Sequence, residues 1–209
     1  MYSALFLTLF SLLTCALSKW AVVVTIAGNN KLSEYFEWTC KSFAHMSDLA
    51  DLLVFHENNV KVLALQGANL CANNVRFISV GQHGFARTIS KVILNKSASK
   101  NKAVKNSLKS MLSFTINHMP RYLVEVKPMT GSLFEKYLMP YSHWTYTDAD
   151  IVWGNLTAWI NVTDINSYDV VTVGKLNDAG KQLLYRNCQL ATLFYLRYLS
   201  RALIPSRAV

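Results

Sequence analysis

Two carboxylates one residue apart, Asp148 and Asp150, are the residues of this 209-residue chain best suited to chemistry. They come after the apolar, aromatic stretch 143–146, which predicts a buried strand, and a second apolar stretch resumes at Ile151. Burying an ionised carboxylate without a partner is costly, so acids beside core segments need a cation, hydrogen-bond donors or water. The pair therefore predicts a site for a divalent metal ion at the end of a strand.

The chemistry open to such a pair is that of a hard cation. Mg²⁺ and Mn²⁺ bind carboxylate oxygens and share their remaining positions with water and substrate phosphates. The ion would neutralise the negative charge that develops on a departing diphosphate. A phosphoesterase that works with two ions would need more carboxylates and histidines than a chain with twelve acids and five histidines supplies.

The elements that must position the acids form an alternating pattern of strands and helices. The first predicted elements are strands over residues 20–27, 51–56 and 74–80 and helices over residues 32–44 and 85–94. Strands separated by helices indicate an α/β fold, a mostly parallel sheet flanked by helices with right-handed crossovers. Ligands of such sheets gather outside the carboxyl ends of the strands, where the acidic pair and the turn at Gly28 are expected.

The second half of the chain has a less regular pattern. Residues 95–110 are polar and basic, which favours a solvated helix or loop over a contact for anionic lipid, nucleotide or nucleic acid. The later predicted elements are a strand over 121–126, a helical stretch over 133–138, the 143–146 strand, a short helix near 155, a strand over 168–173, a loop or hairpin over 174–184 and a helix over 189–203.

Composition bounds the class of protein. An apolar fraction of 52% against 16% charged residues excludes a disordered chain, and the length suits one domain over residues 19–209. Residues 1–18 predict a signal peptide or a membrane anchor, because an apolar run precedes small residues that a signal peptidase would read near Lys19. The expected location is the secretory pathway, in the lumen of the endoplasmic reticulum or Golgi, or outside the cell, with membrane association through residues 1–18 as an alternative to cleavage.

Two further signals bear on this location. Acceptor sequons for N-glycosylation begin at Asn95, Asn155 and Asn161, in agreement with a secretory route. Beyond the leader the cysteines are Cys40, Cys71 and Cys188. Three thiols permit one disulfide at most, and their spacing matches no zinc pattern.

Several short segments accompany the acidic pair in order along the chain. They are Lys127-Pro-x-x-Gly, Leu133-Phe-Glu, His143-Trp-x-Tyr-x-Asp-x-Asp and Gly154-Asn-Leu. Together they resemble the core of a poorly characterised family of glycosyltransferase-like proteins with the GT-A fold. The resemblance covers about residues 20–194. Thr145 stands where that family has glycine, and fuller members continue past the point where this chain stops, which implies a domain that is incomplete at its C-terminal end.

The resemblance implies a domain that binds a nucleotide sugar with Mn²⁺ or Mg²⁺. Asp148 would approach the ribose or the metal, and Asp150 would bind the metal that bridges the diphosphate. Lys127 would reach a phosphate or, as the alternative, end a strand in solvent. The residues implied to contact the donor are Thr25, Gly28, Asn29, Lys127, Asp148 and Asp150.

The function expected from these residues is metal-dependent transfer of a sugar from a nucleotide-diphosphate donor to a hydroxyl of a glycan, protein or lipid. The sequence identifies no catalytic base or nucleophile, so the stereochemical outcome stays open. The alternative is a noncatalytic secreted or lumenal protein that binds a nucleotide or sugar and lacks the acceptor half. No nucleic acid partner is expected.

Overall fold

A computed structural model describes residues 19–28, 32, 34–97 and 101–158, together with the strand segments 170–172, 175–176, 182–183 and 192–195. The leader expected over residues 1–18, the donor residue Asn29, the sequon at Asn161 and Cys188 lie outside these ranges. Within them, no helix has both the length and the apolar character needed to cross a membrane.

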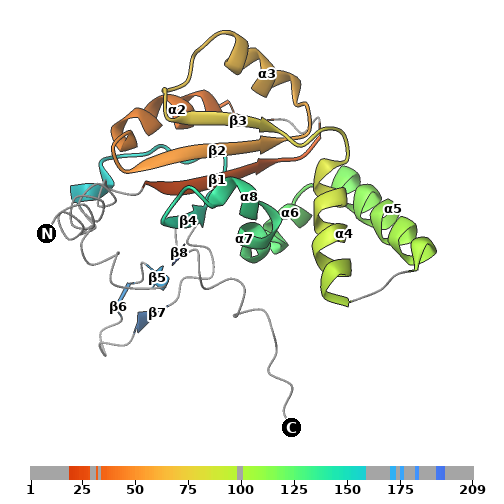
Figure 1. Cartoon of the computed structure of the whole chain (residues 1–209). Helices are drawn as coiled ribbons and strands as arrows, with labels where there is room; N and C mark the ends of the chain where they lie inside the picture. Colours follow the sequence, from red (N-terminus) through yellow and green to blue (C-terminus); the bar gives the residue numbers. More distant parts are fainter. Residues whose placement is uncertain are drawn as a thin grey trace, which may run out of the picture.

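A mostly parallel sheet forms the centre of the protein. Strands β1 (Trp20–Ile26), β2 (Ala50–His56), β3 (Val75–Ser79) and β4 (His143–Tyr146) pair in parallel in the order β3-β2-β1-β4. Figure 1 shows the arrows of β1, β2 and β3 pointing the same way, toward α4. Beyond β4, the antiparallel β8 (Thr192–Tyr195) is followed by β5 (Val170–Thr172). The predicted α/β fold is confirmed.

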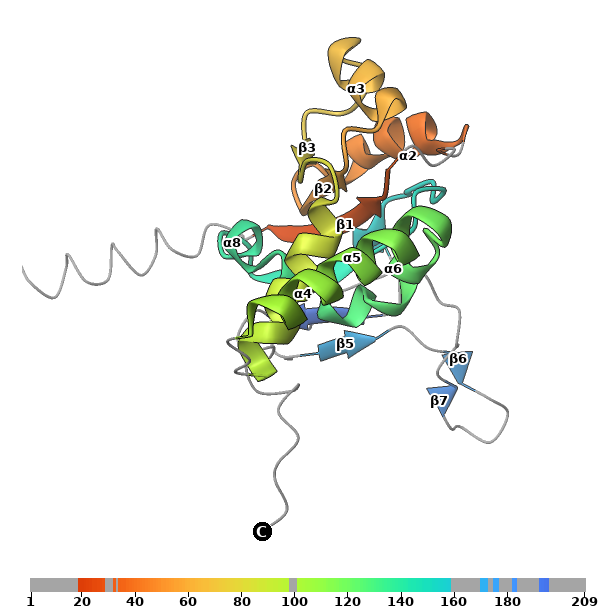
Figure 2. The same cartoon turned by 90° about the vertical axis from the view of Figure 1, so that its right-hand side faces the viewer.

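Both faces of the sheet are covered, as its continuous apolar strands require. Successive side chains of a strand point to opposite faces. One face of β1 and β2 therefore packs on α2 (Phe36–Ser42), η1 (Phe43–Met46) and α3 (Val60–Gly67), through residues such as Val22 and Phe36. The other face, with Val23 and Phe55, packs on the helices that come after β3. Figures 1 and 2 show α2 and α3 on one side of the sheet and α4 to α8 on the other.

The helices of the second face are mostly short. They are α4 (Gly84–Ser97), α5 (Lys102–His118), α6 (Tyr122–Glu125), η2 (Lys127–Met129), α7 (Thr130–Leu133) and α8 (Glu135–Leu138). The stretch predicted as helical over residues 133–138 is therefore two short helices that meet at Phe134. The short helix expected near residue 155 is η3 (Leu156–Ala158). Of the two alternatives for residues 174–184, a loop or a hairpin, the structure has the hairpin, with β6 (Lys175–Leu176) paired with β7 (Gln182–Leu183).

Two predicted elements are wrong. The strand expected at 121–126 is helical: Leu123 and Val126, three residues apart, are both buried, whereas Val124 is 43% exposed. That spacing has the helical period. The helix expected at 189–203 contains strand β8, because Phe194 pairs with Trp144 of β4 and Val170 of β5. Short apolar runs do not distinguish the two states, and here pairing with a distant strand decides.

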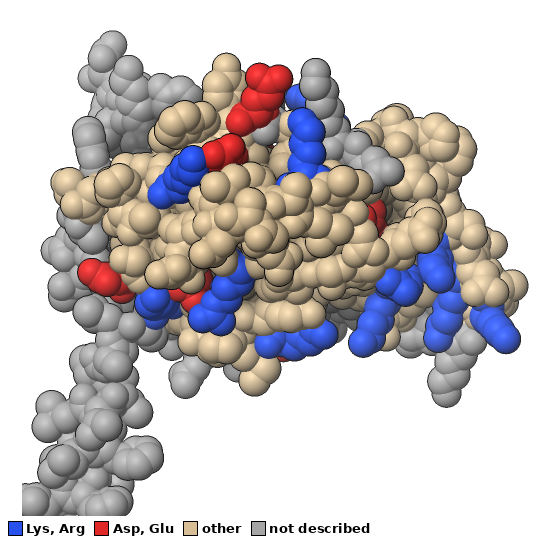
Figure 3. Space-filling view, turned by 90° about the horizontal axis from the view of Figure 1, so that it is seen from above, with Lys and Arg blue, Asp and Glu red and all other residues tan. Residues whose placement is uncertain are grey.

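The basic segment at residues 95–110 contributes the end of α4 and the first half of α5. Its lysines on α5, Lys102, Lys105 and Lys109, are exposed, as expected of a solvated helix. Figure 3, seen from the side of α3, shows Lys and Arg side chains gathered at the right-hand end of the molecule, where Figure 1 places α4 and α5.

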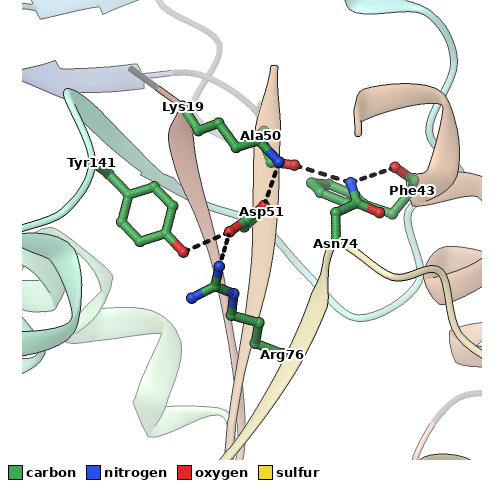
Figure 4. Close-up of polar contacts among 7 residues, drawn as sticks. All are labelled: Lys19, Phe43, Ala50, Asp51, Asn74, Arg76 and Tyr141. Carbon is green, nitrogen blue, oxygen red and sulfur yellow. Dashed lines mark hydrogen bonds and ion pairs between the residues drawn. The ribbon is translucent and has the colours of Figure 1, made fainter. Parts of the chain in front are cut away.

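An ion cluster around the buried carboxylate of Asp51 holds the amino end of the sheet, opposite the carboxyl ends where ligands are expected. The Asp51 side chain, 3% exposed, pairs with Lys19 Nζ at 3.2 Å and with Arg76 Nη2 at 2.9 Å, and accepts a hydrogen bond from Tyr141 Oη at 2.8 Å. Asn74 Nδ2 donates to the carbonyls of Phe43 and Ala50 beside it (Figure 4). Residues that lie in β1 to β4, or just before them, thus meet at this end of the sheet. Burial and the neighbouring Asp51 carboxylate raise the pKa of Tyr141.

Candidate functional site

The strand order changes direction between β1 and β4. From β1 the chain adds β2 and β3 on one side, and then crosses back to place β4 on the other side of β1. Thr147 N donates to Val23 O at 2.9 Å and extends this pairing past the end of β4. Ligands of open α/β sheets bind in the crevice at such a point, outside the carboxyl ends of the strands. Asp148 and the Gly28 turn both lie at this edge.

The central feature of the crevice is an ion pair between Lys127 and Asp148. Lys127 is the first residue of helix η2, which has a proline in its first turn. Its Nζ forms an ion pair with Asp148 Oδ1 at the carboxyl end of β4. The two side chains are 13% and 29% exposed, and Nζ also lies 5.5 Å from the ring centroid of Tyr146. Burial, and then the charge of Asp148, raise the pKa of Tyr146. The pair is therefore largely shielded from water, unlike most surface ion pairs.

A small hollow of about 10 Å³, enough for roughly one water, lies beside the pair. Its polar lining includes Thr25 of β1, Lys127, Tyr146 and Thr147. Thr147 is 2% exposed, and its Oγ1 has no hydrogen-bond partner within the described part of the chain. A buried hydroxyl without a partner is rare in folded proteins, so this oxygen marks a place where a water or a ligand group would be stabilised.

The acidic pair lies where the chain leaves β4 and turns. Residues 149 and 150 form the turn, and helix α2 anchors this part of the chain at two points: Thr39 Oγ1 donates to Ala149 O at 3.1 Å, and Trp153 N donates to Ser42 Oγ at 2.9 Å. Asp148 is half-buried against Lys127, whereas Asp150 is exposed. The two acids thus have different surroundings although one residue separates them.

Few metal-ligating side chains gather beside the crevice. Among the residues that the structure describes, no group of three or more His, Cys, Asp or Glu side chains could hold an ion. Asp148 and Asp150 are the two carboxylates of the turn, and Lys127 already neutralises the first. Such a set does not fit a closed structural zinc site, and it could hold Mg²⁺ or Mn²⁺ only together with water and the phosphates of a ligand.

The turn after β1 is held by Glu57, a residue that sequence reasoning missed. Its carboxylate accepts hydrogen bonds from Gly28 N at 3.1 Å and from Phe85 N, at the start of α4, at 3.0 Å. Asn59 Nδ2 donates to Gly28 O at 2.9 Å. Gly28 has φ +47°, a left-handed conformation that favours glycine. The protein itself therefore engages the Gly28 backbone that was expected to approach a donor.

A signal for Glu57 was present in the sequence. Glu57 directly follows the apolar strand β2, much as Asp148 comes shortly after the apolar strand β4. The site residues otherwise divide into three groups. Thr25, Lys127 and Asp148 come together around the hollow and the ion pair; Gly28 and Asp150 lie on flanking turns; and Asn29 is outside the described residues.

Comparison with known proteins gives a family and a distant fold likeness. The model of a family of unknown function, DUF6625, matches residues 22–204. No curated protein matches the chain. A solved structure, the 4-diphosphocytidyl-2C-methyl-D-erythritol synthase of Anaerococcus prevotii DSM 20548, superposes with a TM-score of 0.40 at 8% sequence identity, over 90% of this chain and 78% of that one. At this distance the likeness carries no argument about function.

Proposed function

The chain belongs to the DUF6625 family of unknown function, and we propose that it binds a nucleotide-diphosphate sugar between β1 and β4 and transfers the sugar, with a metal ion, to a hydroxyl. The observation that supports this function is the shielded Lys127–Asp148 pair at the point where the strand order reverses. A cation, a carboxylate and the Thr147 hydroxyl, which has no partner among the described residues, lie there within one crevice. These are groups that recognise a diphosphate and the hydroxyls of a ribose or sugar.

Lys127 has the central role in this proposal. An ammonium carries three N–H donors, and Asp148 Oδ1 needs only one of them. The remaining donors can bond phosphate oxygens of the donor. Because the group is 13% exposed, its charge is screened less than that of a surface lysine and would stabilise the diphosphate as it leaves.

Asp148 and Asp150 would divide two tasks between them. Asp148, held by Lys127, would accept a hydrogen bond from a ribose hydroxyl, while Thr25 on the neighbouring strand would face the nucleoside. Asp150, together with Asp148, would hold Mn²⁺ or Mg²⁺. When bound, the ion would supply Lewis-acid assistance to the leaving diphosphate.

A noncatalytic nucleotide- or sugar-binding protein is the second candidate. It is favoured by the ion pair, because an Asp148 carboxylate already bonded to Lys127 is poorly suited to act as a general base. The acceptor, whether glycan, protein or lipid, and the secretory or extracellular location belong to the proposal in the same way as the transfer itself.

Binding measurements on the purified full-length chain test the donor site. UDP- and GDP-sugars are titrated by calorimetry with and without Mn²⁺, into the wild type and into Asp150→Asn and Lys127→Met. We expect metal-dependent binding that Asp150→Asn abolishes and that Lys127→Met weakens by about tenfold or more, roughly 1.4 kcal/mol. Asp48→Asn is the matched control, because Asp48 is exposed in the loop that precedes β2, at the opposite end of the sheet.

The outcomes separate the alternatives. Absence of binding in the wild type, or binding that is indifferent to both the metal and the Asp150→Asn change, refutes the donor site. If binding is metal-dependent, release of free nucleotide in the presence of candidate acceptors distinguishes the transferase from the noncatalytic binding protein.

A further inference from the structure

Two cysteines far apart in the sequence meet on the α2 face of the sheet. Cys40 lies in α2 and is fully buried, and Cys71 lies half-buried in the loop between α3 and β3. Each thiol is the largest cause of the shift in the other's pKa, as expected of neighbouring side chains. The backbones are adjacent as well, because Ala72 N donates to Cys40 O at 3.4 Å. Both side chains belong to the same apolar cluster, so their contact is part of the packed core.

We propose that Cys40 and Cys71 form a disulfide bond when the protein meets a disulfide oxidant of the glutathione class. Forming the bond brings the two sulfurs to about 2.05 Å. Side chains that already touch, on backbone segments that already hydrogen bond, need little main-chain movement to do so. The bond would tie α2 to the loop that leads into β3.

The surroundings of the two thiols indicate the order of the reaction. The hydrogen bond from Cys40 lowers the pKa of Cys71, whereas the same hydrogen bond, together with burial as the next cause, raises the pKa of Cys40. The Cys71 thiolate, which is the more accessible, attacks oxidised glutathione and releases one glutathione thiolate. Cys40 then loses its proton and attacks the Cys71 sulfur, releasing the second. Two protein thiols are oxidised, one glutathione disulfide is reduced, and two protons pass to the glutathione thiolates.

The bond would also steady the loop that carries the acidic pair. Cys40 is next to Thr39, whose hydroxyl holds Ala149 O, and Ser42, which accepts from Trp153 N, lies two residues further along the same helix. Fixing α2 to the chain before β3 restricts the helix that anchors this loop. The inference does not rest on the proposed transferase activity, since the thiol contact alone supports it.

The test is oxidation of the purified full-length chain in a glutathione redox buffer, then alkylation of the remaining thiols and peptide mass spectrometry. We expect a peptide pair that links Cys40 to Cys71, and a midpoint of thermal unfolding about 5 to 10 °C above that of the reduced protein, because the bond closes a long loop. Cys188→Ser is the matched control, and it should keep both the linked peptide and the stability gain.

Two variants guard against a folding failure. Cys71→Ser changes a half-buried side chain and should abolish the rise in thermal midpoint on oxidation while leaving a folded protein. Cys40→Ala, at a fully buried position, should also abolish this rise, with a larger loss of stability in the reduced protein. Complete alkylation of both thiols after oxidation of the wild type would overturn the proposal, as would a link from Cys40 or Cys71 to Cys15 or Cys188.

Discussion

Replacing Glu57 with glutamine is expected to destabilise the protein by about 2 kcal/mol, roughly the contribution of one hydrogen bond to a charged group. The Glu57 side chain joins two segments that are far apart in sequence, the Gly28 turn and the start of α4, through one carboxylate. Glu57 is 7% exposed, so water cannot easily replace a lost acceptor.

The magnitude comes from the two hydrogen bonds. Glutamine keeps the shape of the side chain but only one acceptor oxygen, and its amide N–H₂ then faces either Gly28 N–H or Phe85 N–H. One buried donor is left without an acceptor, and the favourable interaction of a negative charge with the first turn of α4, about 0.3–1 kcal/mol, is lost as well. Glu57→Ala removes both oxygens and should cost more, about 3–4 kcal/mol.

Urea unfolding monitored by circular dichroism measures these losses. The transition midpoint should fall with an unchanged slope, and the thermal midpoint should drop by about 4–8 °C for Glu57→Gln in a chain of this size. The control is Glu125→Gln, because Glu125 is exposed on α6 and the change should stay within about 0.5 kcal/mol. A Glu57→Gln protein as stable as the Glu125→Gln control would refute the argument that this carboxylate braces the carboxyl edge.

Three other predictions concern the stability of the fold. Burial lowers the pKa of His56 below 6.5, so the unfolded chain binds a proton at this residue more readily than the folded protein does. The free energy of unfolding should therefore fall as the pH drops below about 6.5. Urea midpoints measured across pH should show a weaker pH dependence for His56→Gln. Asp51→Ala should cost about 1.5–3 kcal/mol in urea unfolding, because the buried hydroxyl of Tyr141 loses its charged acceptor. Arg76→Gln, at a 64% exposed side chain, should cost under about 1 kcal/mol. Equal losses would contradict the role given to the Asp51 carboxylate. Gly28→Ala should destabilise the protein by about 1–2 kcal/mol through the φ of +47° alone, since nothing lies within 4 Å of the added Cβ. Gly67→Ala, in helix α3, should stabilise the protein by about 0.5–1 kcal/mol. The midpoints of thermal unfolding of the two variants should therefore shift in opposite directions.

Local pattern determined much of the fold. The β-branched run at residues 20–26 and the aromatic run at residues 143–146 are strands at nearly the predicted bounds, because apolar segments of this length bounded by turn residues have few other ways to be buried. The same local logic placed Asp148 at a strand end. Its pairing with Lys127, 21 positions earlier, was not predicted, since the sequence indicated only that Lys127 reaches a phosphate or ends a strand in solvent.

The features that depended on distant segments were decided only by the tertiary structure. The 121–126 segment has no periodicity long enough to separate strand from helix, and its burial against the second face of the sheet made it helical. The residues that hold the crevice meet across large separations: Thr39 and Ala149 are 110 positions apart, and Glu57 lies 29 positions from Gly28 and 28 from Phe85. Cys40 and Cys71 likewise show no spacing that predicts their contact. Propensity and periodicity act over a few residues, whereas the order of the parallel strands and their crossovers determine which strand ends become neighbours. The sequence alone therefore indicated the acid at the strand end, and only the tertiary structure identified its partners.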